Sequence, residues 1–178
     1  YNKPSRVTPN MGFKKTSDLI AVSFGNIESA PNTYTQEEIA LQLDILNNEI
    51  FVVLCADLNP SPPDALPGTD TTVSAQVSST SLGGIASLSN TNVIAISERS
   101  IRAAGFVDSG VGFEHMSGET PTAVLDYIAI IATNNFFFGI KGVANLAAKG
   151  ASGRLWGYRA RADASTYAAL VQSEVLSA

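Results

Sequence analysis

Residues 124–143, with the sequence VLDYIAIIATNNFFFGIKGV, form the most apolar stretch of this chain and constrain its fold most. Two runs rich in Ile, Val, Tyr and Phe flank Asn134-Asn135, and Asn accepts the positive φ angles of a tight primed turn. A buried helix is the alternative. The β-branched and aromatic content and the glycines at 139 and 142 oppose it, as does the lack of a single apolar stripe. We therefore predict a buried β-hairpin around which the rest of the chain packs.

Short strand patterns recur along the rest of the sequence. Residues 39–45 alternate apolar and polar side chains, which predicts a strand with one solvent-exposed face. The pair Asn47-Asn48 is then predicted to turn the chain into a second hairpin with residues 50–58. Further strands are predicted over residues 18–25, 71–80, 92–101 and 154–162, with an irregular one between 103 and 120. The strand at 71–80 is expected to be exposed or to lie at a sheet edge, because Thr, Ser and Gln alternate with its apolar residues.

Two other segments carry clear local signals. Residues 59–69 hold four prolines, which predicts a stiff surface loop. Asp57, Asp64 and Asp70 surround this loop; their spacing matches no calcium loop, so we interpret them as solvated carboxylates. At the other end of the chain, Asp163 or Ser165 is predicted to cap a short C-terminal helix.

Together these patterns predict an all-β protein, a single jelly-roll sandwich of about eight strands with a short C-terminal helix. A Greek-key sandwich of immunoglobulin type is the second choice. A length of 178 residues suits one domain. We expect residues 1–17 to form an extended N-terminal arm and residues 18–178 to form a single β-sandwich domain.

Composition argues against most catalytic chemistry. One His and one Cys cannot supply a zinc or iron–sulfur site, and no cofactor motif is present. Cys55 has apolar neighbours, which predicts a buried, inert thiol, although an intermolecular disulfide stays open. His115 has no nucleophile elbow beside it. A carboxylate pair of Glu114 with Glu119 or Asp126 cannot be placed at a working separation from sequence. We therefore predict that the protein is not an enzyme and takes no metal.

The charge of the chain points towards contact with other subunits. A net charge of −5 argues against a nucleic-acid surface, and no apolar run reaches the length of a membrane span. Only 15% of the residues are charged, which is low for a freely soluble small domain. Part of the uncharged surface is therefore expected to meet another subunit.

Four residues are candidates for such subunit contacts. Met11 and Phe13 are apolar anchors in the basic arm, which is either a mobile terminus or a segment that orders on a neighbour or on lipid headgroups. In residues 154–162, Trp156 and Tyr158 alternate with Arg159 and Arg161. We expect the aromatic face to pack into the core and the two arginines to pair with carboxylates across a contact.

The last third of the chain carries a family resemblance, in LDYIAIIATNN (residues 125–135), WGYRARAD (156–163) and YAALVQSE (167–174). It resembles the small single jelly-roll major capsid proteins of icosahedral, internal-membrane viruses of archaea and bacteria. The resemblance implies upright β-barrels that assemble into pseudo-hexameric capsomers beside a second capsid protein.

We therefore expect a structural virion protein, a capsid subunit that self-assembles with a related partner into an icosahedral shell. Another surface-layer or tail structural subunit and a carbohydrate-binding β-sandwich module are the alternatives. A sugar-binding module normally presents an exposed aromatic platform, whereas the only Trp of this chain is expected to be buried.

Overall fold

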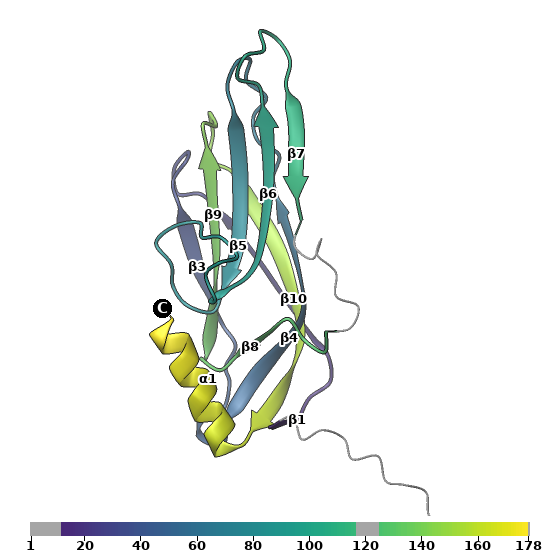
Figure 1. The fold of residues 1–178 in the computed structure, drawn as a ribbon, viewed down its shortest axis with the longest axis vertical. Coiled ribbons are helices and arrows are strands. Elements are labelled where there is room, and N and C mark those ends of the chain that lie inside the picture. Colours follow the sequence, from purple (N-terminus) through teal and green to yellow (C-terminus); the bar gives the residue numbers. More distant parts are fainter. Residues whose placement is uncertain (1–11, 117–124, 178) are drawn as a thin grey trace, which may run out of the picture.

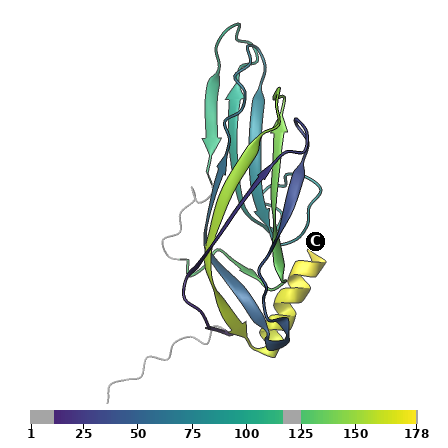
Figure 2. The ribbon, with the colours of Figure 1, turned by 180° about the vertical axis from the view of Figure 1, so that it is seen from behind.

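A computed structural model describes residues 12–116 and 125–177 as two five-stranded antiparallel sheets packed face to face (Figures 1 and 2). Sheet A contains β1 (Phe13–Lys15), β2 (Ile20–Ile27), β4 (Glu49–Pro60), β8 (Ala129–Ile131) and β10 (Gly150–Ala162). Sheet B contains β3 (Thr35–Ala40), β5 (Thr71–Ser78), β6 (Val93–Arg102), β7 (Val111–His115) and β9 (Asn135–Val143). A 3-10 turn, η1 (Ile45–Asn47), precedes β4, and the helix α1 (Ala164–Leu176) follows β10.

The strand pairing is that of a jelly roll. With the short β1 and the edge strand β7 set aside, eight strands remain, and they pair as one long hairpin folded over on itself. The first strand pairs with the last (β2 with β10), the second with the seventh (β3 with β9), the third with the sixth (β4 with β8) and the fourth with the fifth (β5 with β6). Pairs between β4 and β10 and between β5 and β9 then close the two sheets. The predicted fold class is confirmed.

The core lies between the two sheets and is filled by apolar side chains. Phe51, Phe136 and Phe138 are its largest members and are almost fully buried. Each such side chain contributes about 1.5–3 kcal/mol by leaving water. Leu, Val and Ile side chains from both sheets surround the three rings. The sandwich interior is therefore a packed core.

The two predicted hairpins are wrong. Three of their four strands exist, but the strand predicted over residues 39–45 does not, because only residues 39 and 40 belong to β3, residues 41–44 are irregular and Ile45 begins η1. β8 pairs with β4 in sheet A, whereas β9 pairs with β3 and β5 in sheet B, so the chain crosses between sheets at residues 132–134. In the same way β3 lies in sheet B and β4 in sheet A. Asn48 does take the left-handed conformation, with φ 55°, as a turn residue would. A turn signal shows that the chain reverses, but it does not identify the strand that the next segment will pair with.

The expectation that residues 71–80 form an exposed or edge strand is also wrong. β5 lies between β6 and β9 and is almost entirely buried. Its Gln76 is fully buried, donates to the Tyr34 hydroxyl (3.0 Å) and to the Gly84 carbonyl (2.9 Å), and accepts from the Ala86 N–H (2.8 Å). The polar alternation marks a face that is covered by residues 79–92, with hydrogen bonds in place of water.

The alternation along β10 is confirmed, but its two faces are reversed. Leu155 lies in the core between the sheets, and Gly157 faces the same way, because a Cβ on it would come within 2.7 Å of the Phe51 ring. Trp156 and Tyr158 therefore lie on the outer face of sheet A, and Trp156 is only half-buried. The expectation of Trp156 in the core is wrong, since apolar residues occur on both faces of this strand and the pattern alone does not say which one faces inwards.

Cys55 is exposed, so the prediction of a buried thiol is also wrong. Trp156 pairs with Cys55 and the next residue, Gly157, pairs with Val53, which leaves Leu54 as an extra residue in β4. Such a bulge disrupts the inward–outward alternation of a strand. Cys55 therefore projects beside Trp156 on the outer face of sheet A.

The helix α1 closes a second, smaller apolar cluster on the outside of sheet A. Asp163 caps the helix by accepting from the Thr166 N–H (2.7 Å), as predicted, and these hydrogen bonds lower the pKa of the Asp163 carboxyl. Tyr167, Leu170 and Val171 pack over residues of β4 and β10 that point away from the main core, including Ile50 and Val52. No helix of the described residues is long and apolar enough to span a membrane.

Candidate functional site

The strand β1, which contains the predicted contact residue Phe13, lies at the lower end of sheet A (Figure 1). Met11 falls outside the described residues. Phe13 lies in β1 opposite Ala162, and its half-buried ring packs edge-on against the Tyr127 ring, with centroids 6.0 Å apart. Phe13 thus anchors residues 13–15 on the sandwich of its own chain.

The two predicted contact arginines of β10 have different environments. Arg159 Nη2 donates to the Leu41 carbonyl (2.7 Å), and Arg159 Nη1 donates to the Gln42 carbonyl (3.1 Å) and pairs with Glu49 Oε1 (2.7 Å). Arg159 therefore fastens the β3–β4 connection to β10. Arg161 is exposed, and no described residue accepts a hydrogen bond from its side chain.

Arg161 belongs to a basic strip at this end of sheet A. Lys14 is its partner in the β1–β10 register, and both side chains are exposed. Lys15 follows Lys14, and its ammonium lies 5.0 Å from the centre of the Tyr158 ring. Three cationic side chains thus share one edge, where an anionic surface would be attracted.

The seam between α1 and the sandwich contains a buried carboxyl group. Glu174 is 7% exposed, and its Oε1 accepts from the Ala132 N–H (2.7 Å), whereas its Oε2 has no partner. It lines a groove of about 210 Å³ whose other lining residues, from β6, β8, α1 and the loops before β6 and β8, are all uncharged. Burial raises the pKa of Glu174, and the hydrogen bonds from Ala132 and Thr133 only partly oppose this effect.

The opposite face of α1 carries no charge. Glu174 is the only ionisable acid or base among residues 164–176 apart from the tyrosine that packs inwards, and it is buried. The exposed positions are all uncharged: Ala164, Ser165, Ala168, Ala169, Gln172, Ser173, Val175 and Leu176. A solvated helix normally shows charged side chains on its outer face, so this face is typical of a surface that meets protein.

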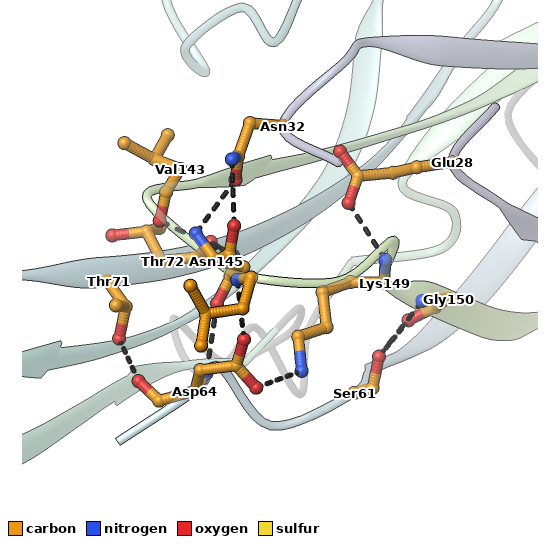
Figure 3. Close-up of polar contacts among 11 residues, drawn as sticks. Glu28, Asn32, Ser61, Asp64, Thr71, Thr72, Val143, Asn145, Lys149 and Gly150 are labelled. Carbon is orange, nitrogen blue, oxygen red and sulfur yellow. Dashed lines mark hydrogen bonds and ion pairs between the residues drawn. The ribbon is translucent and has the colours of Figure 1, made fainter. Parts of the chain in front are cut away.

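At the other end of the sandwich, hydrogen bonds join three loops (Figure 3). Asn32, in the β2–β3 loop, and Asn145, in the β9–β10 loop, bond each other twice, because each donates an N–H to the other (2.9 Å for both bonds). Asn145 Oδ1 also accepts from the Asp64 N–H of the β4–β5 loop (2.9 Å). These bonds tie the three loops together.

The carboxylates of this loop network are satisfied within the chain. Glu28 is buried and accepts from the backbone N–H groups of Gly142 and Lys149, each at 2.9 Å. Asp64 accepts from Lys149 Nζ (2.6 Å) and from the Leu146 N–H (2.7 Å), and these bonds, that of Lys149 first, lower its pKa. Asp64 is thus not the solvated loop carboxylate that its sequence context indicated. The network fixes the shape of the loops.

Nothing in the described residues resembles a metal centre, because no three His, Cys, Asp or Glu side chains of residues 12–116 and 125–177 gather as possible ligands.

Two other carboxylates from the sequence analysis also have partners within the chain. Asp70 accepts from the N–H groups of Ala103 (2.8 Å) and Ala104 (3.0 Å), so it too has a structural role that its sequence context did not indicate. Glu114 pairs with Arg99 across the β6–β7 edge. Its possible partner Glu119 lies outside the described residues.

Comparisons with known proteins were made at three levels. No protein-family model matches the chain, and no curated protein matches it. Among solved structures, that of Desmodium yellow mottle tymovirus is 13% identical and covers 91% of this chain and 95% of its own, with a TM-score of 0.30. Two structures of turnip yellow mosaic virus, one of them an empty head, are 12% and 14% identical. Each covers 82% of both chains, with TM-scores of 0.27 and 0.29 respectively. At these scores the jelly-roll assignment rests on the strand pairing of this chain itself.

Proposed function

We propose that this protein is a structural subunit of a virion, which assembles with copies of itself into an icosahedral shell and has no catalytic turnover. The observation that carries the proposal is the uncharged outer face of α1 on a jelly-roll sandwich whose interior is a packed core. Jelly rolls serve as capsid, lectin and cupin domains. A filled core suits a building block better than it suits a barrel with an internal ligand site.

The rest of the surface supports the same proposal. Large apolar side chains are exposed at both ends of the sandwich, with Leu46 in η1, Leu176 in α1, Val107 before β7 and Leu146 in the loop network all more than 70% exposed. Scattered exposed apolar residues are normal, but a charge-poor helix face together with these residues favours contact between copies. A related second capsid protein, as the resemblance to internal-membrane viruses implies, is the finer form of this proposal.

The basic strip of Lys14, Lys15 and Arg161 suits a second partner of the subunit, an acidic surface. Together with the basic residues of the preceding arm, it would be attracted to an acidic layer such as lipid headgroups. The attraction would be about 1 kcal/mol for each cation near the surface and would fall with added salt.

Assembly itself tests the proposal. The full chain at high concentration and physiological salt is expected to form particles that electron microscopy and sedimentation velocity detect. Ala169→Glu, which adds a charge to the outer face of α1, should block particle formation and leave the melting temperature unchanged. Ala148→Glu, the same change on the exposed β9–β10 loop, serves as the control and should still assemble. A monodisperse monomer under all these conditions would contradict the proposal.

A further inference from the structure

The upper part of the outer face of sheet A is a regular array of side chains from β2, β10 and β4. In the strand register, Arg154 of β10 lies between Ser23 of β2 and Asp57 of β4. One row above, Ser152 lies between Gly25 and Asn59, and one row below, Trp156 lies between Ala21 and Cys55. All nine residues except the half-buried Trp156 are exposed. Four of them, Ala21, Ser23, Gly25 and Ser152, are small, so the surface is low beside the large Trp156 side chain.

This array is hollowed into a groove of about 360 Å³, which we call the Trp156 groove. Its lining includes the indole of Trp156 and the polar side chains of Ser23, Asp57, Asn59 and Ser152. Gly153 of β10 also lines it. The volume falls within the range of small-molecule sites.

Several polar groups of the groove have unused hydrogen-bonding capacity. Arg154 lies directly opposite Asp57, yet its Nε donates to Ser23 Oγ (3.0 Å), and its guanidinium lies 5.7 Å from the Trp156 ring centre. No described residue donates to the Asp57 carboxylate. Asn59 uses only its Oδ1, which accepts from Arg99 (3.2 Å), so its NH₂ group is available in the described structure.

We propose that the Trp156 groove binds a neutral saccharide. A pyranose ring has an apolar C–H face and a rim of hydroxyl groups. The exposed part of the half-buried Trp156 indole would contact the first, and the Asp57 carboxylate, the Asn59 amide and the Ser152 hydroxyl would accept from or donate to the second. Trp156, which the sequence had led us to expect in the core, is thus the aromatic platform of this sugar site.

The charges of the groove select the class of sugar. Arg154 and Asp57 together carry no net charge, and Arg154 is already engaged by Ser23 and Trp156. The Asp57 carboxylate, to which no described residue donates, would accept hydrogen bonds from neighbouring hydroxyls but would repel a carboxylate or sulfate on the ligand. A neutral hexose therefore fits, and an acidic one does not. This activity is separate from shell assembly, because it needs only the groove of a single subunit.

The chain provides its own reporter for this site. Trp156 is the only tryptophan and Cys55, its neighbour in the register, is the only cysteine. Titration of the full chain with lactose, maltose, cellobiose or mannobiose should give a saturable change in tryptophan fluorescence with at least one of them. Half-saturation is expected at about 1–10 mM, as for a weak site on one aromatic platform. The same sugar should slow alkylation of Cys55 by iodoacetamide.

Three variants make the test specific. Asp57→Asn should weaken binding by about tenfold or more, because it removes the charge-assisted acceptor. Ser152→Gln should do the same by filling the low surface, and it keeps the proposal testable if Asp57→Asn misfolds. Asp108→Asn, an equivalent change on the exposed β6–β7 loop, should bind as the wild type does.

The proposal is overturned by any one of three results. One is that no neutral disaccharide changes the fluorescence or the alkylation rate at concentrations up to about 50 mM. The other is that sialyllactose binds while lactose does not, which would make the groove an anion site held by Arg154. Equal binding by the wild type and both groove variants would also place the sugar elsewhere and refute the assignment.

Discussion

At the scale of single residues, Arg159 and Arg161 are two positions apart on β10 but differ in the hydrogen bonds that their side chains make. Arg159 donates to two backbone carbonyls and pairs with Glu49, and the pair is partly exposed. We predict that Arg159→Ala destabilises the subunit by about 1–3 kcal/mol, because it leaves the Leu41 and Gln42 carbonyls without this donor. Urea unfolding of the isolated subunit measures the change in the free energy of unfolding.

Arg161→Ala is the matched comparison for this prediction. Its side chain is exposed and has no described hydrogen-bond partner, so the free energy of unfolding should change by no more than about 0.5 kcal/mol. Equal effects of the two substitutions would show that the hydrogen bonds of Arg159 add nothing to subunit stability.

The buried carboxyl of Glu174 should give the stability of the subunit a distinctive pH dependence. Its pKa is raised above the ordinary value of 4.5, so the folded state binds the proton more tightly than the unfolded state does. The stabilising contribution is therefore complete below pH 4.5 and is lost as the pH rises through the pKa of the folded state. Glu174→Gln, which does not titrate, should raise the melting temperature at neutral pH.

Melting temperatures between pH 4 and pH 8 check this prediction. The stabilisation by Glu174→Gln should grow with pH across this interval and should be small at its acid end. Glu37→Gln, at an exposed position of β3, is the control and should show no such trend. A gain that does not vary with pH would mean that the effect of the substitution is not electrostatic.

At the scale of elements, the loop network makes the stability of three separate loops interdependent. Asn145 is buried; its side chain accepts from the Asp64 N–H and donates to the Thr72 carbonyl (2.9 Å). We predict that Asn145→Ala costs about 1–3 kcal/mol, because it removes the hydrogen-bond partner of the partly buried Asp64 N–H and Thr72 carbonyl. Amide hydrogen exchange should become faster in all three loops together. Faster exchange confined to the β9–β10 loop would contradict the coupling.

At the scale of the whole molecule, the jelly roll joins segments that are far apart in the sequence. β2 (Ile20–Ile27) pairs with β10 (Gly150–Ala162), and β10 also pairs with β1 and β4. A chain that ends at residue 149 is therefore expected not to fold, because it lacks the strand that three others need. Circular dichroism and proteolysis would show this, and a protected, folded fragment would refute it.

The same topology predicts slow folding. The first and last strands of the roll must meet before the sandwich can close, and the entropy cost of closing such a loop comes before the contacts form. Refolding of the full chain should therefore take milliseconds to seconds or longer, in the range of other proteins dominated by non-local strand pairs. Stopped-flow fluorescence of Trp156 measures it.

The sequence by itself determined most of the extended segments and where the chain turns. β-branched and aromatic runs identified most of the strands, Asn48 is a left-handed turn residue, and Asp163 caps the only α-helix of the described residues. These features are local, because propensity and capping depend on a few neighbouring residues. The low charge density also indicated a surface that meets other subunits, which remains a proposal.

Only the tertiary structure decided which strands pair and which face of each strand is inside. The Asn-rich turns at 47–48 and 134–135 connect different sheets, since a reversal of the chain does not name a partner. β5 is buried because the β5–β6 loop folds back over its polar face, and the outward direction of Trp156 could not be predicted because both faces of β10 carry apolar residues. The Trp156 groove could not be found from sequence for the same reason. Its walls come from residues 23, 57 and 156, which lie on three strands that pair in sheet A. These strands pair through backbone hydrogen bonds, and because every residue has the same backbone groups, the sequence does not show which strands will pair.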